Sequence, residues 1–259
     1  MYDSDTRRTA LGLLRTGATV SAVSRAAGIS RSTLRSWTLR PDPSPRMTAD
    51  CPLRDGRPDP APPPGSYSYL LGLYLGAGDA QGEERRGVHA LRIACADAWP
   101  GLIDECAAAV RAVLPGSTVH RVRAPGCTSV VSRSKHWPCL FPQHGAGPKH
   151  LRTVALARWQ RSEVAAAPWH FVRGLIHSDG CRTVNRVRRQ GADGVTRENA
   201  YPRYFFTNGS RDIVGLLTGT LDTVGVEWRV RERRSGDLDV SVARRASVAL
   251  MDAHVGPKW

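Results

Sequence analysis

Two short stretches decide the fold of this chain: residues 71–78 read LGLYLGAG, and residues 173–180 read RGLIHSDG. Each combines large apolar residues with small ones and ends in a glycine, a pattern that predicts a helix followed by a turn. Gly72 of the first stretch corresponds to Gly174 of the second. The match predicts that one structural unit occurs twice in the chain.

A second pair of matching stretches supports this duplication. VS at residues 131–132 leads to GPK at 147–149, and VS at 240–241 leads to GPK at 256–258 over the same length. The offset between these stretches is larger than that between the first pair. The second block therefore holds a few extra residues, which we place at residues 190–199.

Both blocks show the same order of predicted elements. In the first block we expect helices at residues 67–76, 102–114 and 135–141 and strands at 90–94, 118–123 and 128–132, with no clear strand in the polar stretch 80–87. In the second block we expect helices at residues 169–177, 213–224 and 244–253 and strands at 181–187, 203–207, 228–233 and 238–242. The sequence therefore predicts an α+β chain with two pseudo-symmetric αββαββα halves and two sheets.

Composition divides the chain into four segments. Residues 41–65 are rich in proline and almost free of large apolar residues, so we expect no packed element there and predict a linker. Residues 1–40 are predicted to form a small all-α DNA-binding domain. Residues 66–165 and 166–259 are predicted to be the two halves of the duplicated unit.

The N-terminal segment shows the pattern of three short helices. Thr19 is a suitable N-cap for the second helix, Gly28 lies in a tight turn, and Ser30 is a suitable N-cap for the third helix. The segment resembles the helix-turn-helix of resolvases and homeodomain-like regulators, which implies that its third helix enters the major groove. The residues that would then contact DNA are Arg31, Ser32, Thr33 and Arg35. The alternative is a three-helix domain used for protein contacts.

The charge of the chain also points to nucleic acid. Lys+Arg number 37 against 23 for Asp+Glu, which gives a formal net charge of +14, and nearly all of the cations are arginine. Arginine matches phosphate and guanine edges better than lysine does. A GC-rich genome would account for arginine in place of lysine, but not for the excess of cations. Double-stranded DNA is therefore the predicted partner.

The sequence offers no sign of a membrane or secretory protein. No apolar run approaches the roughly 20 residues of a membrane span, and residues 1–8 are too polar for a signal peptide. The six cysteines have no framework spacing, as is typical of reduced thiols. We therefore expect a cytoplasmic protein without a membrane partner.

The two opening stretches resemble the LAGLIDADG motif, and residues 172–180 match it over all nine positions. The resemblance covers about residues 66–259 and implies that the two motif helices pack together at their glycines. It also implies that each helix ends in an acid at the centre of the unit. In this family the two acids hold divalent metals, for which Mg²⁺ is the natural choice, against the scissile phosphates of DNA.

Carried over to this chain, the resemblance gives one metal-binding acid in place of two. Asp179 occupies the acidic position of the second motif, whereas Ala77 occupies that position in the first. Asp79 lies two residues further on and is a doubtful substitute, because a solvated turn residue explains it as well. Lys135 and Arg244, at equivalent repeat positions, are candidates for contacts to the scissile phosphates.

The strands are expected to form a concave surface over the DNA. Alternate residues of a strand face the same side, and the sequence leaves open which alternate set faces the DNA. The candidates for DNA contacts on these strands are Arg121, Arg123, Arg182, Arg186, Arg188 and Arg203, together with His120 and Asn185.

Two functions remain open at this point. The first is a site-specific DNA-binding protein, such as a transcriptional regulator, on an endonuclease scaffold with impaired cleavage. The second is an active Mg²⁺-dependent homing-type endonuclease. The missing acid at Ala77 favours the first, and the intact second motif favours the second. The internal duplication implies that a monomer suffices on DNA.

Overall fold

The computed structural model describes residues 4–39, 53–54, 57–59, 61–84, 87–145, 147–190 and 196–259. The chain splits into two compact units, residues 1–51 and residues 52–259. Within the described residues, no helix is both long and apolar enough to cross a membrane.

The first unit contains three helices, α1 (Ser4–Arg15), α2 (Val20–Ala27) and α3 (Arg31–Leu39). Thr19 caps α2 by accepting a hydrogen bond from the Ala22 amide at 3.2 Å, and the turn after α2 has Gly28 in the left-handed region at φ 64°. The small core of the unit consists of Ala10, Val23, Ile29 and Leu34. Three short helices and a glycine turn are thus present where the sequence predicts them.

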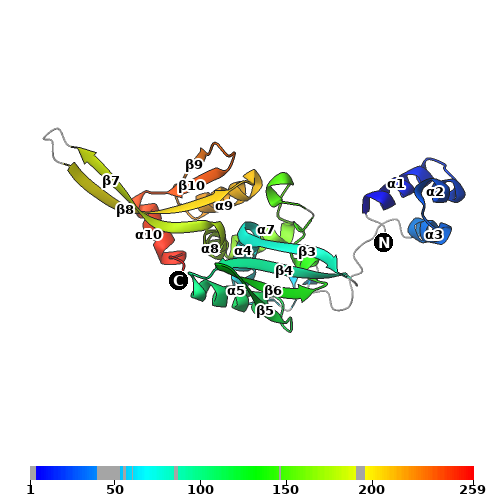
Figure 1. Ribbon diagram of the computed structural model, residues 1–259, viewed down its shortest axis with the longest axis horizontal. Helices are drawn as coiled ribbons and strands as arrows, with labels where there is room; N and C mark the ends of the chain where they lie inside the picture. The colour runs from blue at the N-terminus through cyan, green and yellow to red at the C-terminus, as the bar shows by residue number, and fades with distance from the viewer. Residues whose placement is uncertain are drawn as a thin grey trace. The chain divides into compact units, whose positions relative to one another are not determined.

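The second unit contains two halves with the same order of elements (Figure 1). The first half consists of α4 (Ser66–Ala77), β3 (Gly78–Glu84), β4 (Val88–Ala96), α5 (Pro100–Val113), β5 (Val119–Ala124), β6 (Cys127–Ser134) and α6 (Trp137–Leu140). The second half consists of α8 (Pro168–Asp179), β7 (Gly180–Gln190), β8 (Thr196–Asn208), α9 (Arg211–Thr223), β9 (Arg229–Glu232), β10 (Leu238–Val242) and α10 (Arg245–His254). Between the halves lie the short 3₁₀ helix η1 (Lys149–Leu151) and α7 (Arg158–Ala166).

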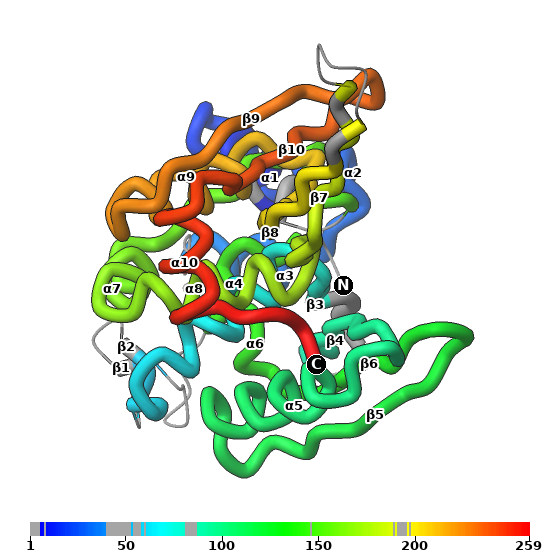
Figure 2. Tube along the Cα trace, turned by 90° about the vertical axis from the view of Figure 1, so that its left-hand side faces the viewer, coloured from blue at the N-terminus to red at the C-terminus, as the bar shows by residue number. Residues whose placement is uncertain are grey.

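The two sheets have the same topology. Their strand orders are β3-β4-β6-β5 and β7-β8-β10-β9, and all pairs are antiparallel. Figure 2 shows α4 and α8 in the middle of the unit, between the strands of the first half and those of the second. This arrangement confirms the predicted α+β fold with two αββαββα halves.

Three details differ from the sequence-based predictions. The polar stretch after α4 is a strand, β3, which is held at the edge of the sheet by backbone pairing with β4. The helix α7 was not predicted. Strands β1 (Leu53–Arg54) and β2 (Arg57–Pro58) pair with each other, and Leu53 packs against the main core, so the prediction of no packed element in residues 41–65 was wrong here.

The extra length of the second block lies in its first hairpin. Further along the chain, the structural equivalence of the two halves differs by one residue from the alignment of their sequences. Strands β7 and β8 are 11 and 13 residues long, against 7 and 9 for β3 and β4. Opposite the glycine that follows each central helix lies Ile93 in the first half and Phe206 in the second, and these pair with Val130 and Val240. Val240 is therefore equivalent to Val130, whereas the sequence aligns it with Val131.

The core lies between the sheets and the helices. In β4 the residues Leu91, Ile93 and Cys95 are buried against the helices, and in β8 Tyr204 and Phe206 are buried in the same way. Since side chains alternate along a strand, the residues between them lie on the opposite side of each sheet. We call this side the open face.

Candidate functional site

The centre of the duplicated unit is the contact between α4 and α8. A Cβ atom added to Gly72 would lie 2.6 Å from the Phe171 carbonyl oxygen, and one added to Gly174 would lie 2.9 Å from the Cα atom of Gly72. Both distances are far below a van der Waals contact, so the two backbones meet at these glycines. The predicted glycine seam is present.

The two helices end differently. The last residue of α8 is Asp179, whose Oδ2 atom accepts a hydrogen bond of 2.8 Å from the Asn208 amide. The last residue of α4 is Ala77. Burial raises the pKa of the Asp179 carboxyl, and the Asn208 hydrogen bond and the nearby ammonium groups of Lys149 and Lys258 oppose that rise. The centre thus has a carboxylate at the end of the second helix and a methyl group at the end of the first.

Two lysines bind the carbonyl ends of these helices. Lys149 Nζ donates hydrogen bonds to the last turn of α4, with Leu75 O at 2.9 Å and Gly76 O at 3.3 Å. Lys258 Nζ donates to Ser178 O in α8 at 2.9 Å. A cation at a helix C-terminus satisfies free carbonyl groups and matches the negative end of the helix dipole. Burial lowers the pKa of both lysines, that of Lys149 to about 8.

These lysines are the residues that sequence reasoning missed. Each is the last residue of a repeated GPK stretch, so the duplication marked them as equivalent. Their partners, however, lie far away in sequence; Lys149 donates to the carbonyl of Tyr74, 75 residues earlier. The repeat could therefore show that they were equivalent, but not what they contact.

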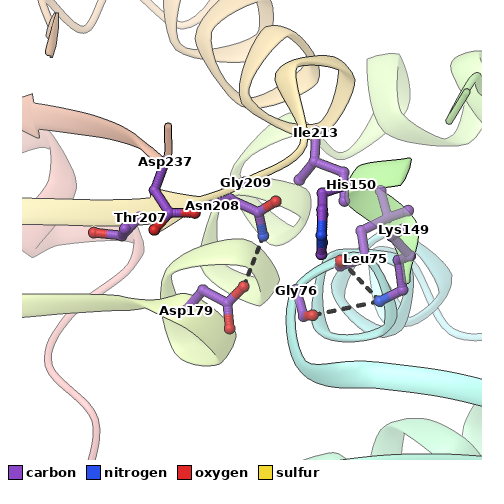
Figure 3. A pocket seen from close by; sticks show the side chains of 10 residues that line it. All are labelled: Leu75, Gly76, Lys149, His150, Asp179, Thr207, Asn208, Gly209, Ile213 and Asp237. Carbon is purple, nitrogen blue, oxygen red and sulfur yellow. Dashed lines mark hydrogen bonds between the residues drawn. The ribbon is translucent and has the colours of Figure 1, made fainter. Parts of the chain in front are cut away.

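Asp179 borders two pockets. The first, of about 410 Å³, also includes Lys149, His150, Asn208 and Asp237, and Figure 3 shows its lining side chains. The second, of about 460 Å³, is lined by Ser178, Asp179, Gly180, Cys181, Phe205, Thr207, Arg233, Asp239 and Lys258. Asp179 thus borders both pockets, the first of which contains Lys149 and the second Lys258.

One of the residues predicted to assist Asp179 lies near the centre, and two do not. Asp79 was expected in a solvated turn, but it lies in β3 opposite Arg92. Burial raises its pKa, and the ammonium group of Lys149, which also interacts with Asp179, opposes that rise. Lys135 is exposed just after β6. Arg244 is exposed and forms a 2.8 Å ion pair with Glu227. Both pockets beside Asp179 are lined by other residues, so the structure does not bring Lys135 or Arg244 to the centre.

The centre does not fit a pair of metal ions. Among the described residues, no group of three or more His, Cys, Asp or Glu side chains is close enough to hold a metal. Mg²⁺ prefers carboxylate and phosphate oxygens, and Asp179 offers one carboxylate to it. At the end of α4 the ammonium group of Lys149 already binds the free carbonyls, and Ala77 offers no ligand.

In the first sheet the predicted DNA-contacting arginines lie on the helix side. Arg121 forms an ion pair with Asp104 of α5. Arg123 lies two residues further along β5 and therefore on the same side. The sequence left the parity of β5 open, because this strand has no buried residue and no apolar alternation to reveal it. The open face of this sheet carries Ala90, Arg92, Ala94, His120, Val122, Ser129, Val131 and Arg133.

In the second sheet most of the predicted arginines also lie on the helix side. Arg182 donates two hydrogen bonds to Asp252 of α10, at 2.7 and 2.9 Å. Arg186 and Arg188 follow on the same side of β7 and form ion pairs with Glu198, at 3.6 and 3.0 Å. Of the arginines predicted to face DNA in this sheet, Arg203 alone lies on the open face.

The open face of the second sheet carries further residues that the sequence did not single out. Arg229 and Arg231 of β9 lie opposite Ser241 and Asp239 and are exposed. Arg233, just beyond β9, forms a 2.6 Å ion pair with Asp239. Asn185, a candidate from the sequence, also lies on this open face, together with Cys181, Thr183, Tyr201, Phe205 and Thr207.

In the first unit, the candidate residues lie at the start of α3. Arg31, Ser32 and Arg35 are exposed, and Thr33 is half-buried. The Ser30 hydroxyl oxygen accepts a hydrogen bond of 3.1 Å from the Thr33 amide, which caps the helix. Leu34 is fully buried, whereas the exposed side of α3 carries the basic residues Arg31 and Arg35.

Comparison with known proteins gives matches only among solved structures. No family model and no curated protein matches the chain. The endonuclease I-DmoI in complex with DNA and Mn is 14% identical with a TM-score of 0.49, covering 74% of this chain and 96% of that one. The LAGLIDADG meganuclease I-AabMI bound to uncleaved DNA is 13% identical with a TM-score of 0.47, covering 73% and 83%.

A third match is the N-terminal LAGLIDADG domain of DUF199/WhiA, 11% identical with a TM-score of 0.44, covering 74% of this chain and 82% of that one. Such low identities say nothing about activity. The chain's own elements show two αββαββα halves that meet at a pair of glycine-bearing helices. This is the arrangement that the two motifs predict.

Proposed function

We propose that this chain is a site-specific double-stranded DNA-binding protein, a transcriptional regulator whose endonuclease-like scaffold has impaired cleavage. The observation that carries the proposal is the unequal centre. Asp179 ends one motif helix, whereas Ala77 ends the other, and Lys149 binds the carbonyls beside Ala77.

DNA is the partner that best fits the charge and shape of the second unit. The chain has a formal net charge of +14. Both sheets present an open face, and the second carries Arg203, Arg229 and Arg231. Cations along a surface replace the counterions of the phosphate backbone and supply sequence-independent affinity. The twofold arrangement of the sheets suits the two half-sites of a duplex, so a monomer is sufficient.

Loss of cleavage follows from the chemistry of the centre. Hydrolysis of both strands needs negative charge to be neutralised at two scissile phosphates, and carboxylate-bound metals provide this in two-metal sites. Ala77 cannot bind a metal. Lys149 and Lys258 place two positive charges beside Asp179, which suits a backbone phosphate better than a second cation. The centre is therefore suited to holding DNA.

The first unit is a second DNA-binding element in this proposal. Its helix α3 would enter the major groove with Arg31, Ser32, Thr33 and Arg35 towards the DNA. We propose residues 1–40 as this domain, residues 41–65 as the connection, and residues 66–165 and 166–259 as the two halves. The sequence of the chain, with no apolar run of membrane-spanning length, fits a cytoplasmic location in this proposal.

The second candidate is a Mg²⁺-dependent endonuclease, and the retained Asp179 favours it. Asp179 borders two pockets with Asn208 and Lys258 nearby, which would allow one Mg²⁺ on the side of the second half. A bound Mg²⁺ would supply an activated water and offset charge on the leaving oxygen. Asp179 would hold it, and Lys258 would lie beside the phosphate. With one such position, nicking of a single strand is the expected reaction.

One experiment separates the two candidates. Duplexes bound by the full-length chain are selected from a random pool, and a supercoiled plasmid with the selected site is incubated with the chain and Mg²⁺. If a site is enriched and the plasmid that carries it stays supercoiled, the result supports the regulator. Nicking at the site that disappears in Asp179→Asn supports the enzyme. Failure to enrich any site contradicts both.

A further inference from the structure

On the open face of the second sheet, Arg203 differs from the other arginines in its burial. Arg203 lies in β8 between Tyr201 and Phe205, all three on the open face, because Tyr204 and Phe206 point into the core. Its side chain is half-buried, whereas Arg229 and Arg231 of the same face are exposed.

Three neighbours fix the plane of the Arg203 guanidinium group. Its carbon lies 4.7 Å from the ring centroid of Phe205 and 5.9 Å from that of Tyr201. Its Nη2 atom donates a hydrogen bond of 3.2 Å to the Ser241 hydroxyl oxygen in β10. The Tyr201 ring is itself held, since its hydroxyl accepts a 2.6 Å hydrogen bond from the Asn185 amide. The group is thus ordered before any ligand binds.

The charge of Arg203 is not balanced by a carboxylate. Within the described residues Arg203 forms no ion pair and its Nη1 atom makes no hydrogen bond, whereas Arg182 and Arg233 are paired with Asp252 and Asp239. A half-buried, oriented and unpaired guanidinium group is expensive to maintain unless it binds something. Its position on the open face places that ligand on the DNA-binding side.

We propose that Arg203 reads a guanine base in the major groove of the bound DNA, an inference that rests on the proposed function. The arginine fork donates to guanine O6 and N7 together, which makes it the commonest side chain for specific recognition of this base. Contact with Phe205 and Tyr201 and the hydrogen bond to Ser241 restrict the side chain and so lower the entropy lost on binding. An oriented fork also suits a phosphate, and loss of guanine preference on substitution is what distinguishes base contact from phosphate contact.

The first half has no counterpart of this arrangement. Ile93 and Phe206 occupy equivalent places, so the residue equivalent to Arg203 is Ala90, three positions earlier in β4. Ala90 is buried and cannot reach a base. The guanine read by Arg203 therefore belongs to one half of the DNA site, and the equivalent residue of the first half does not read a base.

The test compares Arg203 with an exposed arginine of the same face. The full-length chain and the variants Arg203→Ala, Arg203→Lys and Arg231→Ala are each used to select bound duplexes from a random pool. The selected site is then titrated beside a copy in which the enriched guanine is replaced by adenine. Arg203→Lys keeps the charge but loses the fork, and it therefore covers the case that Arg203→Ala does not fold.

We expect the wild-type chain to prefer the guanine copy by roughly 5- to 150-fold. Arg203→Ala should bind the two copies equally, Arg203→Lys should discriminate between them less than the wild-type chain, and Arg231→Ala should weaken both by the same factor. The inference is overturned if Arg203→Ala still enriches the same guanine, if Arg203→Lys discriminates as well as the wild-type chain, or if Arg231→Ala is the variant that loses the guanine. A wild-type chain that binds DNA without any enriched motif contradicts the proposed function itself.

Discussion

The two halves of the second unit share one topology but differ wherever the proposed function places chemistry. The second half ends its motif helix in Asp179 and has strands of 11 and 13 residues in its first hairpin. The first half ends its helix in Ala77, and the matching strands have 7 and 9 residues. A duplicated fold thus needs both halves for its core, while its site can be kept in one of them.

The open faces of the two sheets also carry different residues. That of the second half carries Arg203, Arg229 and Arg231, and that of the first carries Arg92 and Arg133 beside small residues such as Ala90 and Ala94. Because the oriented Arg203 lies in the second half, we expect that half to read the guanine. The first half supplies the other motif helix and a second contact surface.

The largest effect is expected from a substitution at the contact between α4 and α8, where both helices carry a glycine. Gly174→Ala places a Cβ atom against the backbone of α4, so we expect the free energy of unfolding to fall by about 3 kcal/mol or more. Gly215→Ala is the matched control, because Gly215 lies in α9 with no atom within 4 Å of the added Cβ. It should raise stability by up to about 1 kcal/mol. Urea unfolding measures both, and equal effects would contradict the seam.

The unequal centre can be tested by making the halves alike. Ala77→Asp gives α4 the acid that α8 has, and Mg²⁺-dependent cleavage of the selected site should then rise above the wild-type level. The double variant Ala77→Asp with Asp179→Asn controls for the new acid and should lose the gain. Plasmid cleavage assays measure the change. No gain in Ala77→Asp would show that the missing acid is not what limits cleavage.

Lys149 should make stability depend on pH. Its pKa in the folded chain is about 8, below the ordinary value of 10.5. Between these values the unfolded chain keeps the proton that the folded chain has lost, so stability rises with pH, by up to about 1.4 kcal/mol per pH unit. Below pH 8 this gain is absent. Urea unfolding from pH 7 to 10 should show the rise in the wild-type chain and in the exposed control Lys135→Met. The rise should be smaller in Lys149→Met, where Lys258, whose pKa is also lowered, still contributes. The same slope in Lys149→Met would exclude Lys149 as its source.

The fold could be predicted from the sequence because its signals are local and repeated. Glycines at fixed places in two helices and alternating apolar residues, as in β10 at Leu238–Val242, mark elements wherever they are buried. Strand β3 carries no such signal, since backbone pairing at a sheet edge holds it. The sequence therefore offered no clear signal for β3, because this strand is held by its backbone and not by a pattern of apolar side chains.

The site was less predictable, because it depends on contacts between distant residues. Asp179 and Ala77 could be placed from the motif alone. Lys149 and Lys258 could not, since their hydrogen bonds join residues 73 to 80 positions apart. Which arginines face DNA depends on strand parity, and an exposed edge strand such as β5 has no buried residues in its sequence to reveal it.

The smallest predicted effect concerns which side of a sheet an arginine occupies, and it is measured as the salt dependence of DNA affinity. Arg231 is exposed on the open face, and Arg123 lies on the helix side of the first sheet. If the open face contacts the phosphate backbone, Arg231→Ala should reduce the slope of log affinity against log salt concentration by about 0.9, the release of one counterion. Arg123→Ala removes the same charge and should leave the slope unchanged. Titrations between 50 and 200 mM salt distinguish them, and an equal loss in both variants would show that net charge, and not the open face, sets the affinity.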